Sequence, residues 1–199
     1  MKTSILAFML FFAGFLSAQD DVIEAFEKSY DFAAQGNYAE AINSLENVYS
    51  ESSYPLNLRL GWLEYKIGDF IKSKSYYQKA INLEKSGIEA RLGLIYPLTA
   101  LNNQEEVIKI YHEILDIDPN QTYSHYQLAY IYFQRKEYSN AEAHLLKVLR
   151  LYPFDFDSNA LLGSVYVKMG KINEAKTRYR LALQYNPYDN EIKEALSGL

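Results

Sequence analysis

The chain has few of the residues from which catalytic and metal sites are most often built. Its 199 residues include no cysteine, five prolines and a single tryptophan, Trp62. The lack of cysteine excludes disulfides, thiolate nucleophiles, CxxC redox motifs and cysteine zinc sites. Basic residues number 20 against 25 acidic ones, and they form no cluster. Because nucleic-acid-binding proteins carry basic patches, the composition speaks against that class of partner.

Catalytic motifs are also missing. The chain has no GxSxG motif, glycine-rich phosphate loop or dinucleotide fingerprint. Its three histidines, His112, His125 and His144, are never four residues apart and fall at different positions of the repeat described below. The sequence therefore predicts no metal site, and the histidines are expected at the surface. Neither an enzyme nor a bound cofactor is expected.

The first 18 residues are typical of a secretory signal peptide. Lys2 gives a short positive region, Ile5 to Leu16 form an apolar run, and Ser17-Ala18 precede the predicted cleavage point. As a helix, the apolar run would cover about 18 Å, less than the roughly 30 Å of a membrane core, so an uncleaved anchor is the less favoured alternative. The sequence thus predicts export, to the periplasm or outside a bacterial cell.

A repeat of 34 residues runs through the predicted mature domain, residues 19–199. Pro119, Pro153 and Pro187 are spaced by this period. The pattern predicts two amphipathic helices per repeat, joined by a short turn such as those at Gly36 and Gly68. When the repeats are aligned, two further sets of residues occupy equivalent positions, which we call columns. They are Leu60, Leu94, Leu128 and Leu162, and, one position later, Gly61, Ile95, Ala129 and Gly163.

One repeat carries the fullest motif. It reads Leu162-Gly163-x-x-Tyr166-x-x-x-Gly170, followed by Ala175, Tyr179, Ala182 and Pro187. This motif resembles that of the tetratricopeptide repeat (TPR) family. The resemblance implies an all-α fold, a right-handed α-solenoid of about five helix-turn-helix repeats. The expected repeats are about 22–53, 54–87, 88–121, 122–155 and 156–189, with a capping helix at 188–199.

Three departures from the family pattern stand out. The first repeat fits only with its register moved by two residues, and it has Lys28 and Ser29 where Leu-Gly is usual. The second repeat has Glu64 where the family prefers tyrosine. In the third, Pro97 falls inside the first helix and cannot donate a backbone hydrogen bond, so a kink is predicted there.

The resemblance also implies where partners bind, on a concave face lined by the first helix of each repeat. One inward position holds four aromatic residues in successive repeats and then Ser164. Tyrosine and tryptophan give a large contact area at low entropic cost and are enriched at binding hot spots. We call this column the aromatic ladder: Tyr30, Trp62, Tyr96 and Tyr130. The full predicted partner-binding set is Phe26, Tyr30, Leu58, Trp62, Tyr65, Leu92, Tyr96, Tyr123, Tyr126, Tyr130 and Phe133.

The predicted function is a protein-interaction scaffold or adaptor that holds a partner segment in this groove. TPR modules that clamp a terminal carboxylate need lysine and asparagine at inward positions, which here hold Phe26, Tyr30, Leu58 and Trp62. The groove is therefore expected to take an extended apolar or proline-rich segment, or a helix. Two alternatives remain open: the ladder only packs between helices, or the protein is a self-associating homo-oligomeric subunit of an envelope or secreted assembly.

Overall fold

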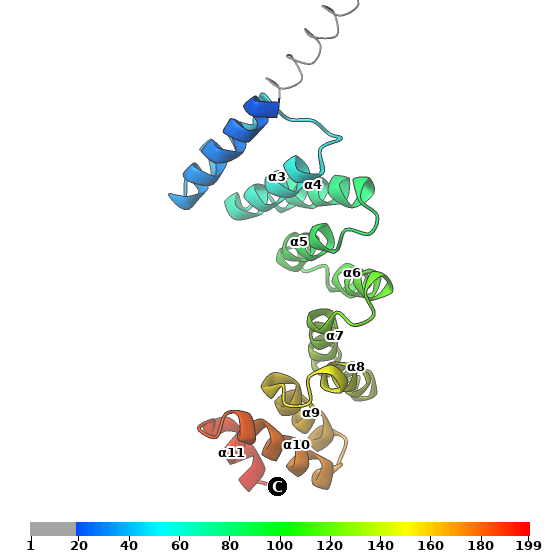
Figure 1. Cartoon of the computed structure of the whole chain (residues 1–199). Helices are drawn as coiled ribbons and strands as arrows, with labels where there is room; N and C mark the ends of the chain where they lie inside the picture. Colours follow the sequence, from blue (N-terminus) through cyan, green and yellow to red (C-terminus); the bar gives the residue numbers. More distant parts are fainter. Residues whose placement is uncertain (1–18) are drawn as a thin grey trace, which may run out of the picture. The chain divides into compact units, whose positions relative to one another are not determined.

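The computed structural model describes residues 19–199, so the predicted signal peptide lies outside the described residues. These residues form helices and turns without strands, which confirms the all-α helix-turn-helix fold class. No described helix is long and apolar enough to cross a membrane. A first helix covers 19–34, and the others follow in Figure 1: α2 Tyr38–Glu46, α3 Tyr54–Ile67, α4 Phe70–Leu83, α5 Ile88–Ala100, α6 Gln104–Ile117, α7 Thr122–Gln134, α8 Tyr138–Leu151, α9 Phe156–Lys168, α10 Ile172–Tyr185 and α11 Asn190–Ser197.

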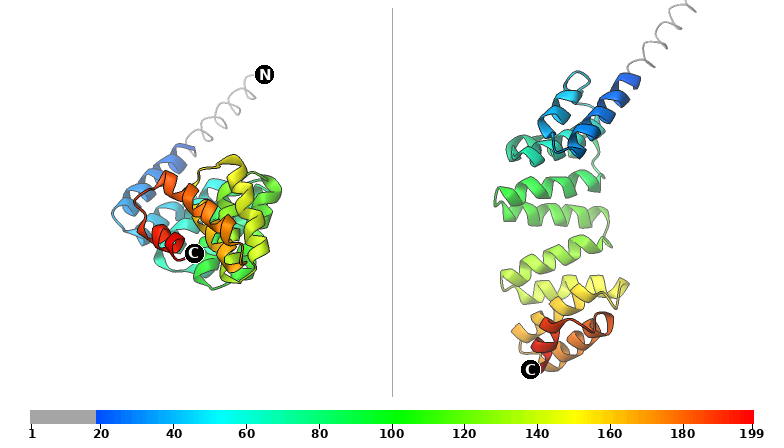
Figure 2. Two further views of the ribbon diagram at one scale, coloured as in Figure 1. Left: turned by 90° about the horizontal axis from the view of Figure 1, so that it is seen from below. Right: turned by 90° about the vertical axis from the view of Figure 1, so that its left-hand side faces the viewer.

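The chain divides into two compact units. Unit 1 holds the described residues up to Val107, and unit 2 is Ile108–Leu199. In unit 1, α3 packs against α2, α4 and α5. In unit 2, α7 packs against α8 and α9, and α10 packs against α9 and α11; the paired helices can be followed in Figure 2. Helices thus pack together within a hairpin, as α3 does with α4 and α7 with α8, and between successive hairpins, as α4 does with α5 and α8 with α9.

The turn inside each hairpin has one residue with positive φ. Such a left-handed residue lets the chain reverse at the end of a helix, and glycine adopts it without steric cost. Four of these residues are 34 positions apart, and the first is displaced by two, which confirms the register shift of the first repeat. The residues are Gly36 (φ 81°), Gly68 (88°), Asn102 (55°), Lys136 (63°) and Gly170 (74°).

Close helix contacts depend on tyrosine rings that lie against glycine backbone. A Cβ on Gly93 of α5 would come within 2.2 Å of the Tyr77 ring of α4, and one on Gly163 within 2.5 Å of the Tyr179 ring. Only glycine permits this approach, since Cβ contacts below 3.0 Å do not occur. Both rings are buried, which confirms that these tyrosines belong to the packing between helices.

The departures from the repeat pattern have local explanations. Ser29 is fully buried and receives hydrogen bonds from Arg59 of the next repeat. Glu64 is also buried, 3.9 Å from Lys72 Nζ, and burial raises the pKa of its carboxyl. The helix α5 continues through the buried Pro97 to Ala100, so this proline does not end it, and the predicted kink stays a prediction.

The expectation of surface histidines is confirmed for the exposed His112 but is wrong for the buried His125, and unit 2 brings all three histidines together. His125 is buried and its Nδ1 lies 2.8 Å from His144 Nδ1. The His112 and His144 rings are 6.0 Å apart, and His112 Nε2 contacts the Tyr132 hydroxyl at 3.1 Å. The sequence spacing concealed this cluster because α6, α7 and α8 contribute one histidine each. Within the described residues, however, no group of three or more such ligands could hold a metal ion.

The hydrogen bonds assign the protons of the pair. His125 Nε2 lies 3.1 Å from the Pro119 carbonyl oxygen, which can only accept, so this nitrogen carries a proton. In the neutral ring His125 Nδ1 is then the acceptor, and His144 Nδ1 donates to it. Burial lowers the pKa of both rings, and for His144 the neighbouring His125, His112 and Lys147 lower it further, to about 4.

We expect this pair to make unit 2 less stable in acid. The unfolded His144 titrates near its ordinary pKa, whereas the folded ring binds its proton only near pH 4. The unfolded chain therefore binds more protons below about pH 6.5, and stability falls by about 1–2 kcal/mol between pH 7 and pH 5. Urea unfolding of wild type and His144→Asn at both pH values measures this. The variant has no ring at position 144 that can titrate, so its free energy of unfolding should fall less between pH 7 and pH 5. Equal losses in the two proteins would contradict the low pKa of His144.

The left-handed residue at Lys136 predicts a stabilising substitution. Lys136→Gly removes the crowding of Cβ at positive φ and should raise the free energy of unfolding by about 0.5–1 kcal/mol. The matched control is Gly170→Ala, where a Cβ meets open space and only the backbone conformation is strained. This control should lower stability by about 1 kcal/mol. Denaturation followed by circular dichroism checks both signs, and a destabilised Lys136→Gly protein would refute the explanation.

Candidate functional site: an aromatic groove

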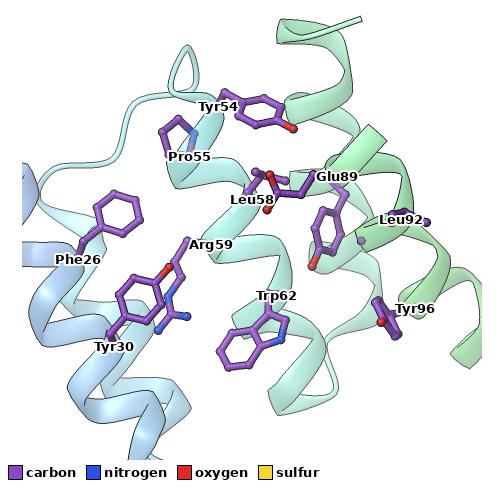
Figure 3. A pocket seen from close by; sticks show the side chains of 12 residues that line it. Phe26, Tyr30, Tyr54, Pro55, Leu58, Arg59, Trp62, Glu89, Leu92 and Tyr96 are labelled. Carbon is purple, nitrogen blue, oxygen red and sulfur yellow. The ribbon is translucent and has the colours of Figure 1, made fainter. Parts of the chain in front are cut away.

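Unit 1 contains a groove of about 640 Å³, within the range of about 300–1,000 Å³ found for ligand sites. The first helices of three successive repeats form its walls, namely residues 19–34, α3 and α5. One tyrosine of α4 completes it. Figure 3 shows most of the labelled side chains directed into the space between these helices. The lining residues are Phe26, Tyr30, Tyr54, Pro55, Leu58, Arg59, Trp62, Tyr77, Glu89, Leu92, Gly93 and Tyr96.

Six of the partner-binding residues predicted for this part of the chain line the groove. They are Phe26, Tyr30, Leu58, Trp62, Leu92 and Tyr96. Tyr65 does not line it and instead packs between Phe70 and Tyr96, with ring centroids 5.7 Å and 5.5 Å away. The helical spacing that placed Tyr65 on the inner face could not show that a neighbouring ring already covers it.

The members of the aromatic ladder in unit 1 differ in exposure. Tyr30 is 58% exposed and Tyr96 53% exposed, so neither ring is part of the core. Trp62 is half-buried and meets the Tyr38 ring edge-on at 5.9 Å. Tyr30 and Tyr96 are therefore available for contact with a partner, whereas Trp62 also holds the hairpin together.

The residues predicted in unit 2 all lie on α7, but they fall into two groups. Tyr123 and Tyr130 are exposed, the latter by 47%. Tyr126 and Phe133 pack against the unit 2 core, and the Phe133 ring lies 5.9 Å from that of Tyr138. Ser164, the next residue of the column, bonds to the Tyr179 hydroxyl at 3.1 Å. Only the first pair offers free ring surface.

The groove contains a cation that the sequence analysis did not select. Arg59 is 9% exposed, and its guanidinium carbon lies 3.8 Å from the Tyr30 ring centroid and 4.9 Å from that of Trp62. Its Nε donates to Ser29 Oγ at 3.1 Å, and Nη2 donates to the Ser29 carbonyl at 2.8 Å. Burial lowers the pKa of this guanidinium. A signal was present in the sequence, since an arginine stands between the inward positions of Leu58 and Trp62.

The other lining residues that sequence reasoning missed are Tyr54, Pro55, Tyr77, Glu89 and Gly93. Tyr77 was assigned to packing alone, yet its buried ring also forms the groove floor, and burial raises its pKa. Glu89 is exposed at the groove and is its one carboxylate. The lining thus offers aromatic surface, one guanidinium and one carboxylate, which suits binding of a chain segment.

A second group of exposed aromatic residues lies in unit 2, at the ends of α8 and α10. Tyr152, Phe154 and Tyr185 border a hollow of about 570 Å³, together with Pro153 and Phe156. Tyr152, Phe154 and Tyr185 are all exposed. Sequence reasoning placed no site here, because these residues fall at repeat ends and not in the inward columns.

Comparison with known proteins connects this geometry to a family. The chain is 31% identical over 113 residues to human DnaJ homolog subfamily C member 3, covering 56% of this chain and 22% of that protein. It is 28% identical over 184 residues to TPR repeat-containing protein MJ1428 of Methanocaldococcus jannaschii, covering 83% and 32%. The chain therefore spans about a fifth to a third of the length of these curated relatives.

Solved structures show the same fold. A tetratricopeptide repeat protein from Parabacteroides merdae superposes with a TM-score of 0.76 at 21% identity, over 90% of this chain and 72% of that one. MamA from Desulfovibrio magneticus superposes with a TM-score of 0.71 at 14% identity, over 86% and 98%. The model of the tetratricopeptide repeat matches residues 54–86, 122–155 and 156–189, half of the chain. The chain belongs to the tetratricopeptide repeat family.

Proposed function

We propose that this protein is an interaction scaffold that holds a segment of a partner protein in the groove of unit 1. TPR proteins are generally protein-interaction scaffolds, which supports the class of function. The observation that carries the proposal is the pair of exposed rings, Tyr30 and Tyr96, at a groove with apolar walls. Exposed aromatic surface of this kind marks interaction sites on soluble proteins.

The form of the groove favours an extended segment or the apolar face of a helix. Three parallel elements line it, and Pro55, Leu58 and Leu92 provide apolar contacts between the rings. Tyr30 and Tyr96 stand at two different repeats, so one partner segment contacts several repeats at once. Binding to successive helices in this way is a recurring mode of peptide recognition.

Tyr96 gives the most direct test. Tyr96→Ala should weaken partner binding by about 2 kcal/mol. Because the half-exposed ring also packs on Tyr65, the same change should lower the free energy of unfolding by about 1 kcal/mol, too little to unfold the protein. The partner is first identified by photo-crosslinking in cells from position 96. Ile71 is the matched control, since it is exposed on α4 of the same unit and does not line the groove.

Capture of one protein from position 96 and not from position 71 would support the proposal. Equal capture from both positions, or a Tyr96→Ala protein that binds as tightly as wild type, would contradict it. The recovered chain also tests the further proposal that the protein is exported. Its N-terminus should be Gln19 if the segment before it is a cleaved signal peptide.

Self-association is the second candidate function, and the exposed aromatic residues of unit 2 favour it. Tyr152 and Phe154 are 59% and 60% exposed beside an apolar hollow, a surface that a second copy of the chain could cover. Sedimentation over a concentration series measures the association. We expect a dimer that Phe154→Ser dissociates and Ile71→Ser does not. A wild-type protein that stays monomeric at the highest concentration rejects this candidate.

A further inference from the structure

Arg59 is a buried cation whose partners are all neutral. Its hydrogen bonds go to the hydroxyl and carbonyl oxygens of Ser29, and its flat face lies against the Tyr30 ring. Among the described residues, no carboxylate oxygen lies within ion-pair distance of it. Buried charges in proteins are normally paired, because removal of an unpaired charge from water is costly.

Three half-buried or buried acidic side chains among the described residues each have a basic partner. Glu106 pairs with Lys74 at 2.6 Å, and Glu142 pairs with Lys171 at 3.0 Å. Even the more deeply buried Glu64 has the ammonium group of Lys72 at 3.9 Å. The guanidinium of Arg59 therefore differs from these three carboxylates, each of which has a group of opposite charge within 4.0 Å.

The free donors of Arg59 are at the groove. A guanidinium has five N–H donors, and Ser29 occupies the one on Nε and one of the two on Nη2, which leaves three. Nη1 makes no hydrogen bond to any described residue. Figure 3 shows the guanidinium beside the Tyr30 ring, with Trp62 on its other side, among the residues that line the groove. A carboxylate that enters between these two rings would meet the remaining Nη donors.

The surroundings would strengthen such an ion pair. The Tyr30 and Trp62 rings limit the access of water to the guanidinium, and charge-assisted hydrogen bonds gain strength where water is excluded. The cost of burying the arginine was already met when the protein folded. When a ligand carboxylate binds, its attraction to the guanidinium therefore has to offset the desolvation of the carboxylate alone.

The lining also limits what the ligand can be. Arg59 is the single cation that lines the groove, whereas phosphate groups are usually held by clusters of basic residues. The walls continue on both sides of Arg59, with Phe26 on one side and Leu92 and Tyr96 on the other. A chain that ended at Arg59 would leave one of these sides empty. Glu89, at the same groove, would repel a second acidic residue.

From these observations we propose that Arg59 recognises the carboxylate of one aspartate or glutamate side chain within an extended, otherwise apolar partner segment. The segment runs through the groove, with its acidic residue between Tyr30 and Trp62 and its apolar residues on both sides. This inference rests on the proposed scaffold function and names the chemistry of its partner.

The test is selection of random peptides on the purified protein, from a displayed library whose peptides are fused at their C-termini and have no terminal carboxylate. We expect the selected peptides to share one acidic residue among apolar residues. Resynthesis of a selected peptide with glutamine or asparagine in place of that acid should weaken binding roughly tenfold or more.

Variants of the protein connect the preference to Arg59. Arg59→Met should abolish the preference for the acid. The selected peptide and its twin, which has glutamine or asparagine in place of the acid, should then bind with equal affinity, as in a double-mutant cycle. The matched control is Lys66→Met, which removes an exposed cation 5.8 Å from the Trp62 ring that does not line the groove, and which should keep the preference. If Arg59→Met fails to fold without its bonds to Ser29, the comparison of the twin peptides on wild type still decides.

The outcomes separate the two proposals. Selection of apolar peptides with no shared acid, or equal binding of the twin peptides to wild type, overturns the role of Arg59 and leaves the scaffold function intact. Failure to select any peptide that Tyr96→Ala weakens counts against the groove itself. A peptide that ends at the acidic position with a free C-terminus, and that binds as tightly as the internal acid, would overturn the choice of a side-chain carboxylate.

Discussion

The contact of the Tyr77 ring with the backbone of Gly93 and Gly61 sets the geometry of unit 1. Tyr77 lies on the second helix of one repeat, and these glycines lie on the first helices of the same repeat and of the next one. Because the ring occupies the volume that a Cβ would fill, α3, α4 and α5 can approach closely. The same ring is the floor of the groove. The packing that stabilises the repeats therefore also fixes the distance between the walls of the candidate binding site.

The tyrosines fall into two groups by their exposure. The inward rings of Tyr30 and Tyr96 remain exposed, whereas Tyr77 and Tyr179 are buried against glycine. In unit 2 the corresponding column position on α8 holds Leu145, and its cluster contains Ala129 where the other repeat has glycine. A larger residue on one helix is matched by a smaller one on the other, which keeps the close packing typical of protein interiors.

Buried polar groups distinguish the two units. In unit 1, Arg59 joins the first helix to α3 through Ser29, so the unusual serine of the first repeat has a structural role. In unit 2, a hydrogen bond from His144 Nδ1 to His125 Nδ1 connects α8 and α7. The arginine lies at the groove, whereas the histidine pair connects α7 and α8. The proposed carboxylate interaction thus belongs to unit 1, whereas the expected loss of stability at low pH belongs to unit 2.

The sequence by itself determined the paired helices of each 34-residue repeat and the left-handed turns at Gly68 and Gly170, because helical periodicity and glycine conformation are local properties. The all-α solenoid and the inward positions followed from the resemblance of its motif to the TPR family. That resemblance also selected six of the residues that line the groove. Only the tertiary structure decided that Tyr65 is covered by Tyr96, that three histidines from three helices meet, and that Arg59 has no acidic partner. These facts depend on which side chains of different helices come within a few ångströms of each other, and no spacing within a single helix contains that information.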